Sequence, residues 1–355
     1  MSSVETAAFA VELFRGADIA PRQRALRQFA AGLESVGRCY DPAWLLAVCD
    51  GLGHVPYVLE ATRGGRIVGL LPLALVRSLL FGRFLVSLPY VNSAGVIGND
   101  REAASAMIEH ACRLADELNV RHLELRHEVE QPHAKLTHRL TSKVHMRLAL
   151  PDTAEELWKR FNPKVRNQIR KAEKQPWTIH WGRVELLNEF YAVFSQNMRD
   201  LGTPVFTRRL FQSILGQFPE DAELCVLRLD RRPVAAALLV HHRGITEVPS
   251  ASSLRAYNTL NANMLMYWHL LQRAIERGQA RFDFGRSSVD SNTFRFKQQW
   301  GAQPESAVWQ YYVRKGTVDD VRRESGKYDR AVDIWRRLPL CLTRLLGPWI
   351  VRGIP

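Results

Sequence analysis

Residues 223–242, ELCVLRLDRRPVAAALLVHH, decide the fold that this sequence predicts. They form two runs rich in leucine, valine and alanine that meet at Asp230-Arg231-Arg232, which is the pattern of two antiparallel strands joined by a tight turn. Residues 56–76, PYVLEATRGGRIVGLLPLALV, have the same form and turn at Gly64-Gly65. The sequence therefore predicts one kind of β-hairpin twice, once in each half of the chain.

The segments that follow the two hairpins also correspond. Apolar residues at helical spacing predict an amphipathic helix after each hairpin, and an apolar strand follows each helix. The strands are 120–126, VRHLELR, and 281–285, RFDFG; the helical residues are Met107, Ala111, Leu114 and Leu118 in the first half and Leu260, Met264, Tyr267, Leu271 and Ile275 in the second. We therefore predict a duplicated α/β unit.

The boundary between the two units is predicted near residue 150. A strand at 144–150 runs into Asp152-Thr153, either of which can cap a helix that begins there. We expect a first domain at 1–150, a second at 151–315 and a basic helical extension at 316–355.

Composition predicts a globular cytoplasmic protein. The chain has 355 residues, 46% hydrophobic and 24% charged, which is enough to build two domain cores. Its five cysteines are far apart and lack the spacing of a disulfide framework, which favours a reducing compartment. The first 16 residues lack the pattern of a signal peptide, and no apolar run reaches the roughly 18 residues of a membrane span.

The formal net charge of +13 and the pI near 9.8 indicate a polyanionic partner. Nucleic acid, a phosphorylated substrate and an anionic membrane surface all fit this charge. Charge alone does not choose among them, because a generally basic bacterial protein has the same composition.

Residues 163–175 predict a basic helix that starts at Asn162-Pro163. Val165, Ile169 and Ala172 form one apolar stripe. The remaining surface carries five cations and one acid, Glu173; the cations are Lys164, Arg166, Arg170, Lys171 and Lys174. A solvated face normally mixes charges of both signs, so this helix predicts an anion-binding surface, with a plain exposed helix as the alternative.

Residues 281–301, RFDFGRSSVDSNTFRFKQQWG, predict the wall of a binding site. A strand ends at Gly285, and Arg286 and Ser287 supply groups that bind anions. The following turn leads into a helix that carries Lys297. The alternative is a surface corner with a solvated lysine.

Three segments resemble the FemAB family, specifically its branch associated with PEP-CTERM/exosortase systems. The segments are Asp283-Phe284-Gly285-Arg286-Ser287 with Phe296-Lys297-Gln298-Gln299-Trp300-Gly301; Lys164-Val165-Arg166-Asn167-Gln168-Ile169-Arg170-Lys171-Ala172, which is also similar to BioF2-like acetyltransferase domains; and Ser87-Leu88-Pro89-Tyr90-Val91-Asn92. They occur in both halves of the chain. The resemblance therefore covers nearly all of it.

This resemblance implies an α/β (α+β) fold of two tandem GNAT-like domains. It implies that Lys297 lies beside the terminal phosphate and ester of a charged tRNA, and that Phe296 shapes the acceptor site. It also implies that Arg166, with Lys164 or Arg170 and with Asn167 of the same motif, binds the diphosphate of an anionic substrate. The branch is linked to envelope and exopolysaccharide systems, so the acceptor would be a cell-envelope precursor, soluble or lipid-linked.

The donor is predicted from a missing motif. GNAT enzymes that use acyl-CoA usually bind its pyrophosphate with a glycine-containing loop before the central helix. Neither 91–103 nor 248–264 has that spacing. This weakens acyl-CoA as the donor. The resemblance to FemAB proteins implies aminoacyl-tRNA instead, and both donors stay open; no further cofactor is expected.

Other candidate residues are less specific. Asp283 could accept the proton of the attacking amine or only fix Arg286, and Glu247 is an equal candidate for the acceptor. Tyr90 and Asn92 follow a strand end and are predicted to bind substrate. Trp44 is either a stacking residue or part of the core. The five histidines between His122 and His145 lack the spacing of a metal site, so we expect no metal.

The end of the chain, 334–355, alternates apolar side chains with arginines. This composition suits the surface of an anionic membrane, which would make the protein peripheral at the inner membrane. The alternative is a helix packed on the domains, because Pro339 and Pro348 prevent one long amphipathic helix.

We therefore predict an acyl- or aminoacyltransferase that forms an amide on an amino group, with its chemistry in the second domain. Two alternatives stay open. One keeps the fold and uses acyl-CoA or acyl carrier protein as donor for N-acetylation. The other is a non-catalytic module that binds RNA or an anionic surface through its charge.

Overall fold

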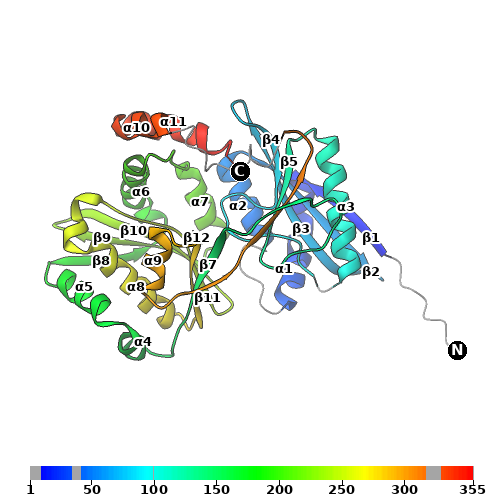
Figure 1. Cartoon of the computed structure of the whole chain (residues 1–355). Helices are drawn as coiled ribbons and strands as arrows, with labels where there is room; N and C mark the ends of the chain where they lie inside the picture. The colour runs from blue at the N-terminus through cyan, green and yellow to red at the C-terminus, as the bar shows by residue number, and fades with distance from the viewer. Residues whose placement is uncertain (1–8, 34–40, 99, 317–328, 355) are drawn as a thin grey trace. The chain divides into compact units, whose positions relative to one another are not determined.

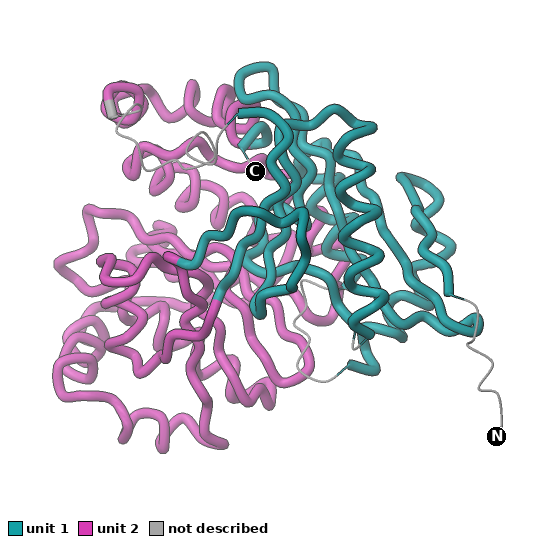
Figure 2. The backbone as a smooth tube through the Cα atoms, turned by 45° about the vertical axis from the view of Figure 1, so that its right-hand side comes forward, with its two compact units in different colours: residues 1–141, 307–323, 352–355 teal, residues 142–306, 324–351 magenta. Residues whose placement is uncertain are grey.

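The computed structural model describes residues 9–33, 41–98, 100–316 and 329–354. The chain forms two compact units, which Figure 2 shows in teal and magenta. Unit 1 comprises Met1–Thr141, Ala307–Arg323 and Arg352–Pro355, and unit 2 comprises Ser142–Ser306 and Glu324–Val351. Each unit contains one seven-stranded mixed sheet (Figure 1).

Unit 1 places α3 on one face of its sheet and α1 and α2 on the other. Its elements are β1 (Phe9–Arg15), the 3-10 helix η1 (Gly16–Arg22), α1 (Gln23–Gly32), α2 (Pro42–Leu52), β2 (Val55–Arg63), β3 (Arg66–Ser78), β4 (Gly82–Val86), α3 (Arg101–Glu117), β5 (His122–His127), β6 (His138–Leu140) and β14 (Val308–Val313).

Unit 2 places α8 with α4 and α5 on one face of its sheet and α6 with α7 on the other. Its elements are β7 (Lys143–Ala149), α4 (Ala154–Arg160), α5 (Pro163–Glu173), β8 (Trp177–Gly182), the 3-10 helix η3 (Val184–Leu186), α6 (Leu187–Leu201), α7 (Arg208–Gln217), β9 (Ala222–Leu229), β10 (Arg232–His242), β11 (Ile245–Ser253), the 3-10 helix η4 (Arg255–Leu260), α8 (Ala262–Glu276), β12 (Arg281–Ser288), α9 (Asn292–Gln298), β13 (Gln303–Ser306), α10 (Asp329–Arg337) and α11 (Leu340–Val351).

The two sheets have the same strand order, which confirms the predicted duplication. Unit 1 runs β1-β2-β3-β4-β5-β14-β6, and unit 2 runs β8-β9-β10-β11-β12-β7-β13. Both predicted hairpins are present, as β2–β3 and β9–β10. Each sheet also contains a strand after its hairpin, β4 in unit 1 and β11 in unit 2, which pairs in parallel with the strand after the long helix. The strand pattern is weak in both. Strand β4 has only a short apolar run, and β11 contains Pro249 and several small polar residues.

The unit boundaries differ from the predicted 150 and 315 because each sheet takes its sixth strand from the other half of the chain. Strand β7 was predicted to end the first domain, yet it pairs with β12 in unit 2. Residues 308–313 were assigned to the second domain, yet they form β14, which pairs with β5 in unit 1. Strand pattern reveals a strand but not its partner, since pairing joins residues far apart in sequence. Of the predicted extension, residues 317–328 and 355 lie outside the described residues.

The helix starts follow the capping residues that the sequence offers. The side chain of Thr153 accepts a hydrogen bond from the N–H of Glu156 at the start of α4, and Asn162 accepts one from Val165 at the start of α5. Pro163 stands in the first turn of α5, where its missing N–H costs nothing. The apolar stripe of α5 is completely buried, which orients the basic face outward.

The C-terminal helices α10 and α11 pack on α6 of unit 2. Pro339 separates the two helices, whereas Pro348 lies inside α11 without ending it. A Cβ at Gly347 would lie 2.8 Å from the backbone nitrogen of Val205, so α11 approaches the core too closely for a larger residue. Within the described ranges, every helix is too short or too polar to cross a bilayer.

Candidate active site in unit 2

Strands β11 and β12 part from each other halfway along the sheet of unit 2. Their parallel pairing runs from Ile245–Arg281 to Glu247–Asp283 and stops there. Strand β11 nevertheless continues to Ser253, and β12 continues to Ser288. A sheet that opens between two parallel strands leaves backbone groups available to a ligand, because they no longer bind each other.

Gly285 turns β12 at the point where the strands part. Its φ of 77° lies in the left-handed region that glycine adopts without strain, and the strand register against β7 shifts between Asp283 and Arg286. The N–H of Gly285 donates a 2.7 Å hydrogen bond to Oδ1 of Asp283. The strand was predicted to end at Gly285. Instead, Gly285 forms a β-bulge within β12, which continues to Ser288.

Lys297 lies on α9 and reaches this bulge. Its side chain is buried with the residue 9% exposed, and its Nζ donates hydrogen bonds of 3.0 Å to the carbonyl of Gly285 and 3.1 Å to that of Arg286. Burial lowers the pKa of Lys297, Asp283 raises it and Arg286 lowers it further, to about 8. At neutral pH the side chain is therefore mostly a buried ammonium, held where the strands part.

Asp283 is held by an arginine that the sequence analysis did not select. Oδ2 of Asp283 accepts a 2.9 Å hydrogen bond from Nε of Arg147, and Arg147 also binds Glu305 at 2.7 Å. The ion pair fixes the orientation of the Asp283 carboxylate, with Arg147 as a partner. Arg147 was missed because its strand was assigned to the other domain.

Ser287 and Arg286 follow the bulge in β12. The hydroxyl of Ser287 is buried, and within the described part of the chain no hydrogen-bond partner reaches its Oγ. A buried polar group of this kind is a natural contact for a ligand. Arg286 is half-buried, and its carbonyl is one of the two that bind Lys297.

Aromatic side chains join α9 to α8 and to the start of α5. The ring of Phe296 packs edge-on against Tyr267 of α8 at 5.0 Å between centroids. Trp300, just after α9, packs against Phe161, which precedes α5, at 5.3 Å. The Lys297 helix and the basic helix therefore belong to the same helical layer of unit 2.

The basic face of α5 is accessible. Lys164, Asn167 and Arg170 are exposed, and Arg166 is half-buried. The guanidinium of Arg170 lies 5.6 Å from the ring of Trp158, which orients it along the helix surface. The cations that were predicted to bind an anion thus lie together on one helix, and anion binding by them stays a prediction.

The start of α8 offers a second place for an anion. Asn261 precedes the helix with a φ of 57°, in the left-handed region that a glycine usually occupies, and no side chain caps the first turn. Uncapped N–H groups at a helix start attract phosphate. Asn261 thus adopts a left-handed backbone at this helix start without a glycine.

Unit 1 fills the corresponding position with its own side chains. In the matching registers Glu124 corresponds to Asp283, and Arg126 corresponds to Arg286. Nε of Arg126 donates a 2.7 Å hydrogen bond to Glu124, its NH1 donates one of 2.7 Å to the carbonyl of Val91, and residue 126 is only 3% exposed. Unit 1 therefore has an internal ion pair where unit 2 has the candidate site.

The predicted binders of unit 1 belong to the loop over this ion pair. Tyr90 has a φ of 74° and is half-buried, and the carbonyl of Asn92 accepts a 3.2 Å hydrogen bond from the indole of Trp309. Trp44 is 0% exposed, which corrects its assignment as a substrate contact to a core residue. Tyr90 and Asn92 remain predicted substrate contacts.

The two matched arginines give a paired prediction. We expect Arg126→Gln to lower the free energy of unfolding by about 3–5 kcal/mol, because it leaves buried Glu124 without its cation. Arg286→Gln should lower kcat/KM for amide formation about tenfold or more, with a smaller loss of stability. Urea unfolding and steady-state kinetics of both variants test this, and equal kinetic defects would contradict the assignment of the site to unit 2.

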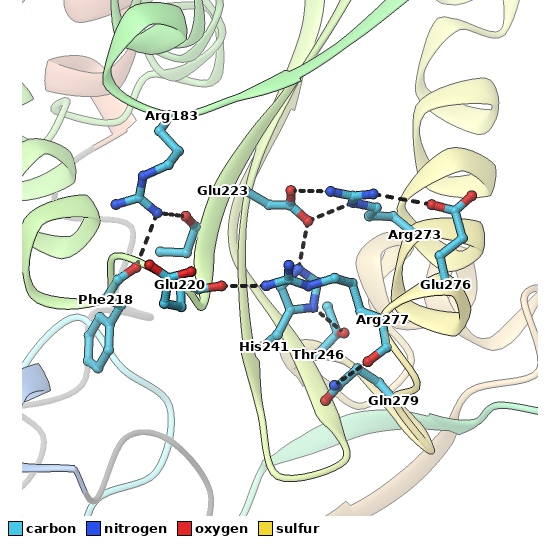
Figure 3. A network of polar contacts seen from close by, with 11 residues as sticks. Arg183, Phe218, Glu220, Glu223, His241, Thr246, Arg273, Glu276, Arg277 and Gln279 are labelled. Carbon is cyan, nitrogen blue, oxygen red and sulfur yellow. Dashed lines mark hydrogen bonds and ion pairs between the residues drawn. The ribbon is translucent and has the colours of Figure 1, made fainter.

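A second polar cluster lies where β9 and β11 begin and β10 ends (Figure 3). Glu223 of β9 accepts hydrogen bonds of 2.9 Å from His241 and from two nitrogens of Arg273, and the other ring nitrogen of His241 lies 2.8 Å from the hydroxyl of Thr246. Every member thus has a partner within the fold. This cluster ties α8 to the sheet and is a structural network.

Metal-binding residues do not gather anywhere in the described part of the chain: no group of three or more His, Cys, Asp or Glu could hold an ion there. Cys49, Cys112 and Cys225 are buried thiols, and Cys341 is exposed. Cys39 lies outside the described residues.

Comparison with known proteins supports the assignment of the site to unit 2. Residues 159–298 match the family described as the acetyltransferase (GNAT) domain. This range contains α5, the parting strands and Lys297. Residues 159–298 are therefore similar to an acetyltransferase domain of the GNAT type.

Solved structures show the same fold over most of the chain. FemX matches with a TM-score of 0.64 and 14% identity over 85% of this chain and 97% of that one. The C-terminal domain (DUF2156) of a putative lysylphosphatidylglycerol synthetase from Agrobacterium fabrum matches with a TM-score of 0.55 and 12% identity over 85% and 94%. A tandem GNAT protein from the clavulanic acid biosynthesis pathway matches with a TM-score of 0.52 and 11% identity over 87% and 100%.

These similarities establish a FemAB-like tandem GNAT fold. A search of curated protein sequences finds no match to this chain.

Proposed function

We propose that the protein transfers an acyl or aminoacyl group to an amine, with the chemistry in unit 2. The observation that carries this proposal is the buried ammonium of Lys297 at the parted strands of a GNAT-type domain. A fixed cation in a water-poor site stabilises negative charge that develops during the reaction. The ion pair that fills the corresponding place in unit 1 supports a single reactive site.

The reaction needs few groups from the protein. The neutral amine attacks the donor carbonyl, a C–N bond forms, and the C–O bond of an ester or the C–S bond of a thioester breaks. The amine proton leaves with solvent or a nearby carboxylate, for which Asp283 and Glu247 are the two candidates. Lys297 stabilises the oxyanion or the leaving phosphate-bearing group, and Phe296 shapes the acceptor side.

The donor and acceptor follow from the resemblance to FemAB proteins. We propose aminoacyl-tRNA as the donor and an anionic or lipid-linked cell-envelope precursor as the acceptor, within the PEP-CTERM/exosortase context and on the cytoplasmic side of the inner membrane. Acyl-CoA or acyl carrier protein is the second donor candidate, which the uncapped start of α8 supports. The basic face of α5 would bind the diphosphate of the substrate through Arg166, Lys164, Asn167 and Arg170.

The proposal is tested by incubating the purified protein with charged tRNA or acyl-CoA and a set of candidate amines. Amide product with one donor identifies the reaction, and protection from heat by CoA thioesters but not by tRNA would select the second donor. Salt-sensitive binding of RNA without amide product from any donor would instead support a non-catalytic binding module.

The role of α5 gives a separate prediction. Arg166→Glu should raise KM for a diphosphate-bearing acceptor by about tenfold or more, because a charge-assisted contact becomes repulsive. Arg208→Glu is the matched control, since Arg208 is exposed at the start of α7 on the other face of the same unit. Initial rates at varied acceptor concentration measure the effect. The same KM in both variants would remove α5 from the acceptor site.

A further inference from the structure

Helix α11 exposes an apolar stripe on its outer face. Leu342, Leu345, Leu346 and Trp349 are 41%, 65%, 44% and 65% exposed and follow the i, i+3, i+4, i+7 spacing of one helical face. A surface helix normally presents polar residues to water. The outer face of α11 presents apolar side chains to water instead.

The opposite face of α11 is firmly packed, so the stripe does not result from a detached helix. Thr343, Gly347 and Val351 are buried, and Gly347 lies against the backbone of Val205. Nε of Arg344 donates a 2.8 Å hydrogen bond to the hydroxyl of Ser195 on α6. The helix is therefore anchored to unit 2, and its outer face has a fixed direction.

The charges around the stripe are positive. Residues 340–351 contain no acidic residue, and Arg337, Arg344 and Arg352 precede, interrupt and follow the helix. Tryptophan and leucine next to arginine are the composition that binds the interface between water and anionic lipid. Four side chains supply only a few hundred Å², well below the roughly 800 Å² per partner of a stable protein interface.

We propose that the outer face of α11 inserts into the headgroup region of an anionic bilayer. Leu345 and Trp349 enter the boundary with the acyl chains, and Arg337, which is exposed just before the helix, meets lipid phosphates. This attachment is separate from amide formation. It would place the reactive unit at the surface where lipid-linked acceptors are found.

The turn between β3 and β4 in unit 1 has the same composition. Leu79 and Leu80 are 106% and 74% exposed, and Arg77 and Arg83 flank them. The hydroxyl of Ser78 accepts hydrogen bonds from the N–H groups of Leu80 and Phe81, which fixes the turn. This tip is a second exposed leucine pair between arginines.

Vesicle binding tests the proposal with the full chain. Phosphatidylcholine vesicles with and without about one third phosphatidylglycerol are sedimented with wild type, Leu345→Glu, Trp349→Glu and Val184→Glu. Val184 is a matched control because it is 56% exposed in the same unit and receives the same charge. We expect the two α11 variants to lose about tenfold in binding to anionic vesicles, and Val184→Glu to bind like wild type.

Three results would overturn the proposal: wild type that does not sediment with anionic vesicles, α11 variants that bind as well as wild type, or a wild-type dimer in sedimentation velocity that Leu345→Glu dissociates. Amide formation with a water-soluble acceptor should be unchanged in Leu345→Glu. A failure of membrane binding is therefore distinguishable from a failure of the proposed function.

Discussion

Lys297→Ala is expected to lower kcat/KM for amide formation by about 10²–10³-fold, because it removes the fixed cation that stabilises developing negative charge. Lys297→Met keeps most of the buried stem and removes only the charge, so it separates chemistry from packing. Both variants are compared with wild type in the transfer assay and by urea unfolding. Turnover equal to that of wild type would remove Lys297 from the mechanism.

The pH dependence of the same residue distinguishes a cation from a base. The pKa of Lys297 is lowered to about 8, so the ammonium is present below that pH and lost above it. The rate ratio of wild type to Lys297→Arg, whose guanidinium does not titrate, should therefore fall as the pH rises through about 8. A ratio that rises over this range would show that neutral Lys297 acts as a general base.

Glu223→Gln is expected to lower the free energy of unfolding by about 3–5 kcal/mol. The substitution leaves His241 and Arg273 without the buried carboxylate that binds both. Glu276→Gln is the matched control, because Glu276 is 62% exposed and contacts the same arginine at 3.3 Å; its loss should stay below about 1 kcal/mol. Urea denaturation measures both, and similar losses would refute the structural role of the network in Figure 3.

The same carboxylate predicts acid sensitivity. Burial raises the pKa of Glu223, but hydrogen bonds from His241 and Arg273 outweigh burial and lower it from 4.5 to about 2. A folded pKa below the unfolded one stabilises the protein above pH 4.5, and this stabilisation of about 3 kcal/mol is lost as the pH falls toward 2. In Glu223→Gln the free energy of unfolding should therefore fall less between pH 4.5 and 2, by about this amount.

Local sequence patterns predicted much of the second unit. The hairpin over 223–242 became β9–β10, and the basic helix over 163–175 became α5 with Asn162 as its cap. Glycine at 285 marked the turn in β12 because a positive φ favours that residue. These features depend on neighbours within a few residues, so the sequence contains the information directly.

Partners far apart in sequence could not be predicted in the same way. Nothing near Asp283 indicated that Arg147 would bind it, because the two residues meet only when β7 pairs with β12. Trp44 had two open interpretations, and burial decided for the core. The apolar residues of 334–355 were visible in the sequence, but which of them face solvent depended on how α11 packs on α6.

The sequence by itself determined the duplicated hairpin–helix–strand pattern and the basic surface of 163–175, since residue type and spacing act locally. The resemblance to FemAB proteins added the candidate role of Lys297. Only the tertiary structure decided that each sheet takes its sixth strand from the other half of the chain. It also decided that unit 1 closes the matching position with Arg126 and that Lys297 is buried against two carbonyls. The physical reason is that strand pairing, burial and pKa depend on groups brought together from distant parts of the chain.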